Sequence, residues 1–162
     1  MGAVNIHQSF WLLPFNDENY TALSLVASNI TDNSGDVLLI QTIAMEEKYE
    51  KAVVARFNKA RKIEYEEILD KCEDFFAEIN KEIERNNFTF AEAEENEEEL
   101  EKLLSWFKKV QLRDLFESPL QEITAKKLEE CRKCFEDFNS KTFENEKNEP
   151  PPDIQIANDS LA

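Results

Sequence analysis

The chain has 162 residues and a formal net charge of -16, with 35 Asp and Glu against 19 Lys and Arg. This length fits one domain with an appended tail, and 12 Phe and 2 Trp supply bulky apolar side chains for a core. Only 2 Gly and 5 Pro occur, which argues against a many-stranded β fold and favours long helices with short connections. The acidic excess disfavours anionic membranes, and it allows nucleic acid as a partner only where Lys and Arg concentrate locally.

Cysteine usage and hydropathy indicate the cellular compartment in which the protein is expected to work. Cys72, Cys131 and Cys134 make an odd number, and together with the lack of a signal peptide they favour a reducing cytoplasm. The apolar segment from Ser9 to Phe15 is far too short to cross a bilayer, and no other run reaches the needed length. We therefore expect a soluble, cytoplasmic protein with no membrane partner.

The first 45 residues predict a strand, a helix and a second strand. Residues 5–15 are β-prone around their centre and include a proline near their end, which predicts a buried strand. Asn16 or Asp17 can cap the following helix, whose apolar residues recur every three or four positions. The Asp-Asn-Ser-Gly segment at 32–35 breaks this helix, and residues 36–44 then predict the second strand.

Two long helical stretches come next. Residues 46–84 contain no Gly or Pro and keep a helical rhythm, which predicts one long helix or two joined by a slight bend. Thr89 and Glu92 form a capping box for the next helix. That helix starts with seven Glu between positions 92 and 101, and its second half is amphipathic. The mutual repulsion of these charges predicts that its first turns are exposed.

A final helix and a tail complete the predicted elements. Ser118 is expected to cap this helix, with Pro119 at its first position. A regular apolar stripe then predicts its buried face: Leu128, Cys131, Phe135 and Phe138. Residues 144–162 are polar, contain three consecutive prolines and show no periodicity, which predicts a disordered tail.

Cys131 and Cys134 have the C-x-x-C spacing of metal and redox sites. A structural zinc site needs four ligands, and the only other candidates are Cys72 and His7. The pair lies in the middle of an amphipathic helix, whereas a redox thiolate is expected at a strand-to-helix junction. We interpret these cysteines as packing thiols and expect no metal ion and no cofactor.

Catalytic residues are hard to find in this sequence. His7 is the only histidine, which removes most acid–base and triad schemes, and we expect it to be a hydrogen-bonded structural residue. The Glu-rich run at 92–101 has no interleaved apolar residues that would raise a carboxyl pKa. No Gly-rich phosphate loop and no flavin or nicotinamide fingerprint occurs. These observations predict a protein that is not an enzyme.

One basic stretch is a candidate contact for an anion or a partner. Arg56, Lys59 and Lys62 advance by three residues and so drift slowly around one side of a helix. Glu64, Glu66 and Glu67 follow at once and dilute the positive field, which favours an ion-paired surface over an anion site.

Several stretches stand in a distinctive order: Trp11–Pro14, Ala55–Arg61 followed by Glu64 and Tyr65, Phe88–Asn96 with Leu100–Leu103, and Trp106 with Gln111–Phe116. Taken together they resemble the N-terminal domain of the ChrB family of bacterial chromate-resistance proteins, over about Gly2 to Phe143. The resemblance implies a setting in chromate-responsive regulation of an efflux system. It implies no site residue in this chain.

The resemblance also implies a shortened sheet. Members of the family usually begin with a further strand and helix before the Gly-Ala at positions 2–3, and many continue into a separate C-terminal domain. The first half of the family resembles a ferredoxin-like sheet, so a missing strand would expose hydrogen-bonding edges. We therefore expect Ser9–Leu13 and Val37–Ile43 either to be covered by the long helices or to mediate self-association.

The predicted fold is α+β and mainly α, with a two-strand remnant of a ferredoxin-like sheet followed by three or four long amphipathic helices. Residues 1–143 form the domain, with strand, helix and strand at 1–45 and the helical part at 46–143. The predicted function is non-enzymatic, in chromate resistance or its regulation, through a protein partner, a second copy or an oxyanion such as chromate.

Three alternatives remain open. A DNA-binding transcriptional regulator would need a compact basic helix, which the sequence lacks. A helical protein–protein interaction module unrelated to chromate needs no further sequence feature. An enzyme such as a chromate reductase would need Cys131 and Cys134 to be reactive.

Overall fold

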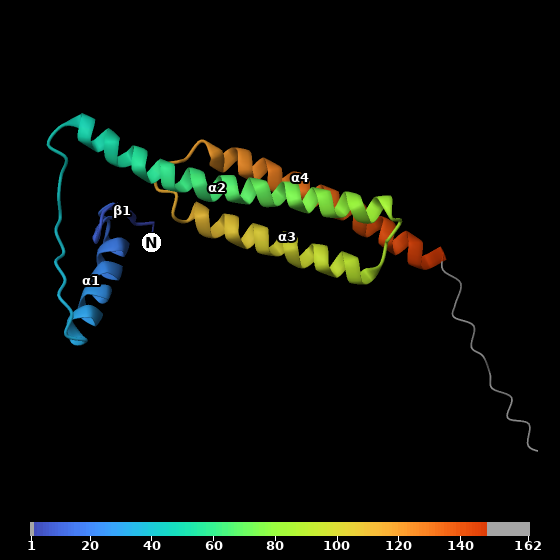
Figure 1. Cartoon of the computed structure of the whole chain (residues 1–162), viewed down its shortest axis with the longest axis horizontal. Coiled ribbons are helices and arrows are strands. Elements are labelled where there is room, and N and C mark those ends of the chain that lie inside the picture. Colours follow the sequence, from blue (N-terminus) through green and yellow to red (C-terminus); the bar gives the residue numbers. More distant parts are fainter. Residues whose placement is uncertain (1, 149–162) are drawn as a thin grey trace, which may run out of the picture.

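The structure, a computed structural model, describes residues 2–148 and contains within them two strands and four helices (Figure 1). Three long helices lie side by side, and the hairpin and the first helix lie beside one end of this bundle (Figure 1). The predicted class, α+β and mainly α, is confirmed. In chain order the elements are β1 (Val4–His7), β2 (Phe10–Leu12), α1 (Asp17–Asp32), α2 (Glu47–Glu84), α3 (Phe90–Gln111) and α4 (Leu120–Asn148).

The core lies between α2, α3 and α4. Each helix buries a stripe of residues spaced by three or four, the repeat that keeps one face of a helix against its neighbours. Fully burying one large apolar side chain contributes about 1.5–3 kcal/mol, so these stripes supply most of the stabilisation. The largest apolar side chains among the core residues are Tyr65, Ile68, Phe75 and Ile79 from α2, Leu100, Leu103 and Val110 from α3, and Leu128, Phe135 and Phe138 from α4.

Several predicted helix ends are confirmed. Residues 47–84 form one continuous helix, and the Asn16 side chain caps α1 by accepting from the Asn19 backbone N–H at 2.7 Å. Thr89 caps α3 by accepting from the Glu92 backbone N–H at 3.3 Å. The start of α4 differs from the prediction because it begins at Leu120, and the backbone N–H of Ser118 donates to the carboxylate of Asp114.

The prediction of a single buried strand over residues 5–15 is wrong. The segment reverses at Gln8, whose φ of 45° is left-handed, and β1 and β2 pair as an antiparallel hairpin. Val4 is buried, whereas Phe10 and Trp11 are exposed. A tight turn within the β-prone run therefore replaces the continuous strand: β1 packs against α2, whereas the long helices do not cover β2.

The prediction of a second strand over residues 36–44 is also wrong. This segment is extended but pairs with no other strand within residues 2–148, and its apolar side chains face solvent. A strand is stable only when a neighbour satisfies its backbone N–H and C=O groups. The helices α2–α4 do not cover it, so one of the two expectations for Val37–Ile43 is excluded.

The end of the described chain corrects the predicted tail. The helix α4 continues to Asn148, so residues 144–148 are helical and not part of a disordered tail. The remainder of the predicted tail, from residue 149 onward, lies outside the described residues. None of the helices within residues 2–148 combines the length and apolar character needed to cross a membrane.

Candidate functional site

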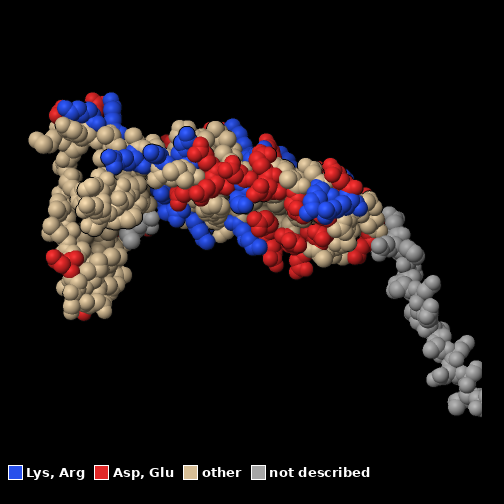
Figure 2. Space-filling view, in the orientation of Figure 1, with Lys and Arg blue, Asp and Glu red and all other residues tan. Residues whose placement is uncertain are grey.

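The three basic residues singled out by sequence lie on the first half of α2 but do not converge. Arg56 donates through Nη1 to the backbone carbonyl of Ile6 at 3.3 Å, which fastens β1 to α2. Lys62 forms an ion pair with Glu66 at 3.4 Å. Lys59 is exposed and contacts no charged partner within residues 2–148. Figure 2 shows Lys and Arg gathered where α2 passes the hairpin, and Asp and Glu gathered over the middle of the bundle.

A buried polar network lies next to this basic stretch, where the first half of α2 meets the end of α3. Arg61 is only 8 % exposed, and its Nε lies 3.0 Å from Oε2 of Glu64. The other oxygen of Glu64 accepts from Nη2 of Arg113 at 2.7 Å. One carboxylate therefore lies between two guanidinium groups and sets their spacing.

The network continues from α2 to the loop before α4. The buried Tyr65 hydroxyl donates to Asp114 at 3.0 Å, and Asp114 also accepts from the backbone N–H of Ser118 at 3.0–3.1 Å. Burial and the hydrogen bond to Asp114 raise the pKa of Tyr65 well above its ordinary value. The hydroxyl is therefore a permanent donor. We call Arg61, Glu64, Tyr65, Arg113 and Asp114 the polar network.

The start of the chain packs onto this polar network. A Cβ at Gly2 would lie 2.6 Å from the Arg113 carbonyl oxygen, so only glycine fits this approach. The rings of Phe57, one turn before Arg61, and Phe116, two residues after Asp114, lie 5.1 Å apart. Arg61 and Tyr65 are buried in the polar network, whereas Glu64 and Arg113 remain partly exposed.

Part of the hydrogen-bonding capacity of the polar network is unused. Within residues 2–148, the buried Nε and Nη1 of Arg61, Nε of Arg113 and Oε2 of Glu64 have no hydrogen-bond partner. Nε of Arg61 lies within ion-pair distance of Glu64, but its N–H does not point at the carboxylate oxygen. The contact is therefore an ion pair without a hydrogen bond. Unpaired N–H groups on buried guanidinium groups are costly, and an anion that accepts from them would be bound strongly.

The cysteines lie away from this site. Cys72 and Cys131 are buried in the core, and Cys134 is half-buried against it. The hydrogen bond with Cys72 and burial raise the pKa of the Cys131 thiol, and burial raises the pKa of Cys134. Within residues 2–148, all three are free thiols and no group of His, Cys, Asp and Glu could hold a metal ion.

His7 does not have the role expected from the sequence. Its side chain is exposed at the end of β1 and makes no hydrogen bond within the part of the chain that the structure describes. The prediction of a hydrogen-bonded structural histidine is therefore wrong. The strand that was expected to bury it is half of an exposed hairpin.

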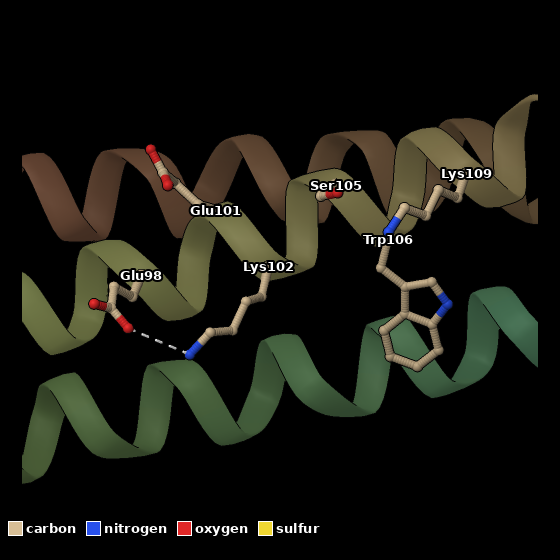
Figure 3. A pocket seen from close by; sticks show the side chains of 6 residues that line it. All are labelled: Glu98, Glu101, Lys102, Ser105, Trp106 and Lys109. Atoms are coloured by element: carbon tan, nitrogen blue, oxygen red, sulfur yellow. Dashed lines mark ion pairs between the residues drawn. The ribbon is translucent and has the colours of Figure 1, made fainter.

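Two surface hollows within residues 2–148 are each lined by residues of a single helix. One is lined by residues of α3 alone, and Figure 3 shows Glu98, Lys102 and Trp106 extending from α3 toward α2 while Glu101 points away. Glu98 and Lys102 form an ion pair at 3.6 Å. A second hollow is lined by residues of the first turns of α2. A hollow lined by a single helix cannot surround a substrate.

The polar network was missed by sequence reasoning. Its partners come from positions 49 residues apart, as in the pairs Tyr65–Asp114 and Glu64–Arg113. One signal was available: Arg61 lies between Phe57 and Tyr65 at spacings of four, so a charged residue occupies the apolar stripe of α2. A charge at a core position indicates a buried partner or a ligand.

The family model described as "Protein ChrB, N-terminal" matches residues 1–149. The chain therefore belongs to the ChrB N-terminal family, which makes it a protein related to chromate resistance. No curated protein and no solved structure matches it. Three of the stretches that carry the resemblance, 55–61, 64–65 and 111–116, together contain every residue of the polar network.

Proposed function

We propose that the chain is a non-catalytic domain that binds an oxyanion, with chromate as the first candidate, at the polar network. The observation that carries the proposal is the set of N–H groups on Arg61 and Arg113 that lack an acceptor. Chromate is a tetrahedral dianion, and its oxygens accept from the planar fork of a guanidinium group as sulfate and phosphate oxygens do.

The geometry around the two arginines supports an anion in this place. Arg113 is partly exposed, whereas Arg61 is buried, so an anion would enter beside Arg113 and meet Arg61 at the inner end. Binding would release Glu64 from one of its two guanidinium partners.

The proposed absence of catalysis rests on chemistry. The raised pKa of Cys131 keeps this thiol protonated and unreactive at neutral pH, which disfavours a cysteine-based reductase. Neither the hollow on α3 nor the one on the first turns of α2 is lined by a residue of the polar network, so neither would hold a second substrate against it. The proposed setting is the cytoplasm, and the three free thiols support it.

The test is calorimetric titration of the full chain with chromate and, in parallel, with sulfate. Replacing Arg113 by Lys keeps the charge but removes the paired N–H groups. We expect at least about tenfold weaker binding, since a charge-assisted hydrogen bond contributes about 1.5–3 kcal/mol and about 1.4 kcal/mol is tenfold. Arg132→Lys on the exposed face of α4 is the matched control, with unchanged binding.

Two results would contradict the oxyanion proposal. Wild-type protein that binds neither anion would exclude it, as would equal binding by Arg113→Lys and Arg132→Lys. A gel shift with duplex DNA that weakens steeply with salt would instead favour the DNA-binding regulator.

A further inference from the structure

Residues 36–45 form an extended segment with unusual exposure. Its large apolar side chains face solvent: Leu38 is 79 % exposed, Ile43 88 % and Met45 93 %. The segment holds one charged residue, Asp36, at its beginning. Soluble proteins bury such a run or place it against a partner.

The backbone of this segment is equally unpartnered. Within residues 2–148, no residue from 36 to 45 donates or accepts a hydrogen bond. The composition is that of a strand, with Val37, Leu38, Leu39, Ile40 and Ile43. Its backbone is therefore open to pairing with another extended segment, the mode in which strands add to exposed edges.

Charge singles out this end of the molecule as a place where two copies can meet. Residues 1–45 contain four of the 35 Asp and Glu and none of the 19 Lys and Arg. Figure 2 shows this part nearly free of charged side chains, in contrast to the acidic bundle. Two copies with a net charge of -16 each repel one another, and contact through the uncharged end keeps the acidic bundles apart.

The exposed apolar area matches what a stable dimer needs. A specific interface buries about 800 Å² on each partner. Four half-exposed aromatic side chains in the same uncharged part of the chain, Phe10, Trp11, Phe15 and Tyr20, offer roughly 100 Å² each, about half of what such a residue can bury. Aliphatic side chains of α1 and of residues 36–45 add a further share: Leu25, Val26, Ile30, Leu38, Leu39, Ile40, Ile43 and Met45.

We propose that residues 36–45 of two copies pair as antiparallel strands and form a homodimer. A pairing centred on Ile40 places Val37 opposite Ile43 and Asp36 opposite Ala44, so no like charges face each other. The arrangement is self-complementary about a two-fold axis, which closes the assembly at two copies. It involves none of the residues of the polar network.

The test measures mass and amide exchange over a wide range of protein concentration. Light scattering after size exclusion gives a dimer for the wild type, and residues 37–43 gain protection as the concentration rises. Ile40→Lys places two lysines against each other at the centre of the pairing, so it yields a monomer. Ile123→Lys, at an exposed position on α4, is the matched control and stays dimeric.

Four outcomes would overturn the proposal. The first is a wild-type monomer at every concentration, and the second is a dimer that survives Ile40→Lys. The third is a monomer with concentration-independent protection of residues 37–43, which would mean that the segment completes its own sheet. The fourth is a monomer that floats with lipid vesicles. Loss of chromate binding leaves this proposal unaffected because the two sites share no residue.

Discussion

A buried guanidinium group needs acceptors for its N–H groups, and Arg61 finds only one carboxylate partner, Glu64. Removing one member of a buried charged pair leaves the other uncompensated, which is strongly destabilising. This is why the anion test uses Arg113, whose side chain is partly exposed, and keeps its charge by substitution with Lys.

Tyr65 allows the hydrogen bonding of the polar network to be tested separately from its charge. Tyr65→Phe removes the donor to Asp114 and keeps the ring in the core. We expect the free energy of unfolding to fall by about 1–2 kcal/mol, because a buried acceptor loses one of its partners. Urea denaturation measures the difference, with Tyr49→Phe at an exposed position as control. Equal stability of the two variants would show that the Tyr65–Asp114 bond contributes nothing.

Glu82 near the end of α2 predicts a pH dependence of stability. The hydrogen bond from Asn87, followed by the charges of Arg85 and Lys81, lowers the pKa of Glu82 below its ordinary value. A carboxyl whose folded pKa is depressed stabilises the protein above its unfolded pKa, and this stabilisation is lost as the pH falls through the folded pKa. We therefore expect Glu82→Gln to be less stable than wild type at neutral pH.

The destabilisation caused by Glu82→Gln is expected to disappear at low pH. The difference in free energy of unfolding between Glu82→Gln and wild type should shrink as the pH falls through the depressed pKa of Glu82. Urea unfolding midpoints measured across a pH series would show this convergence. Glu84→Gln, two residues further along α2 and exposed, is the control and should show no such convergence. A difference that stays constant down to low pH would indicate a packing effect.

At the scale of elements, α2 determines how the bundle is held together. Its stripe contacts both α3 and α4, and its far face is solvated. Lys127 of α4 reaches back to α2, where it pairs with Glu73 at 2.7 Å and lies over the ring of Phe76. Exposed ion pairs of this kind contribute little, so the apolar stripe carries the stability.

Two isoleucines on α2 test this distribution of stability. Ile68 is fully buried, whereas Ile63 is 50 % exposed on the same helix. Ile68→Ala should lower the free energy of unfolding by about 2–5 kcal/mol through lost burial and a cavity. Ile63→Ala should change it by less than about 1 kcal/mol. Chemical denaturation of both variants measures the two changes in free energy of unfolding. Equal decreases would contradict a core centred on α2–α4.

At the scale of the whole molecule, two parts of different character meet at the polar network. The helical bundle is strongly charged and well packed, and the first 45 residues are nearly uncharged and mostly exposed. The contacts that join them include the Arg56–Ile6 hydrogen bond and the packing of Gly2 on Arg113. An anion held at Arg113 would therefore lie beside the joint between the two parts.

Helices could be predicted well because their signals are local. The residues of a helical stripe lie within one or two turns of one another, so spacing alone identifies the buried faces of α2 and α4. The caps at Asn16 and Thr89 are likewise formed by residues three positions apart. These elements needed no knowledge of what lies across the core.

Strands and the candidate site could not be predicted in the same way. Residues 36–44 are β-prone, yet a strand needs a partner strand, and their composition does not tell whether one lies alongside. Arg61, Glu64, Tyr65, Arg113 and Asp114 meet only after α2 and α3 pack antiparallel. Arg56, Lys59 and Lys62, which are close in sequence, diverge in their contacts.

The sequence by itself determined the helical class, the buried faces of the long helices and the family of this protein, because each depends on residue type and short-range spacing. The tertiary structure decided which charges are buried together and which strand-forming segment has no partner. Both depend on contacts between residues far apart in the chain, which become defined only when the apolar stripes pack.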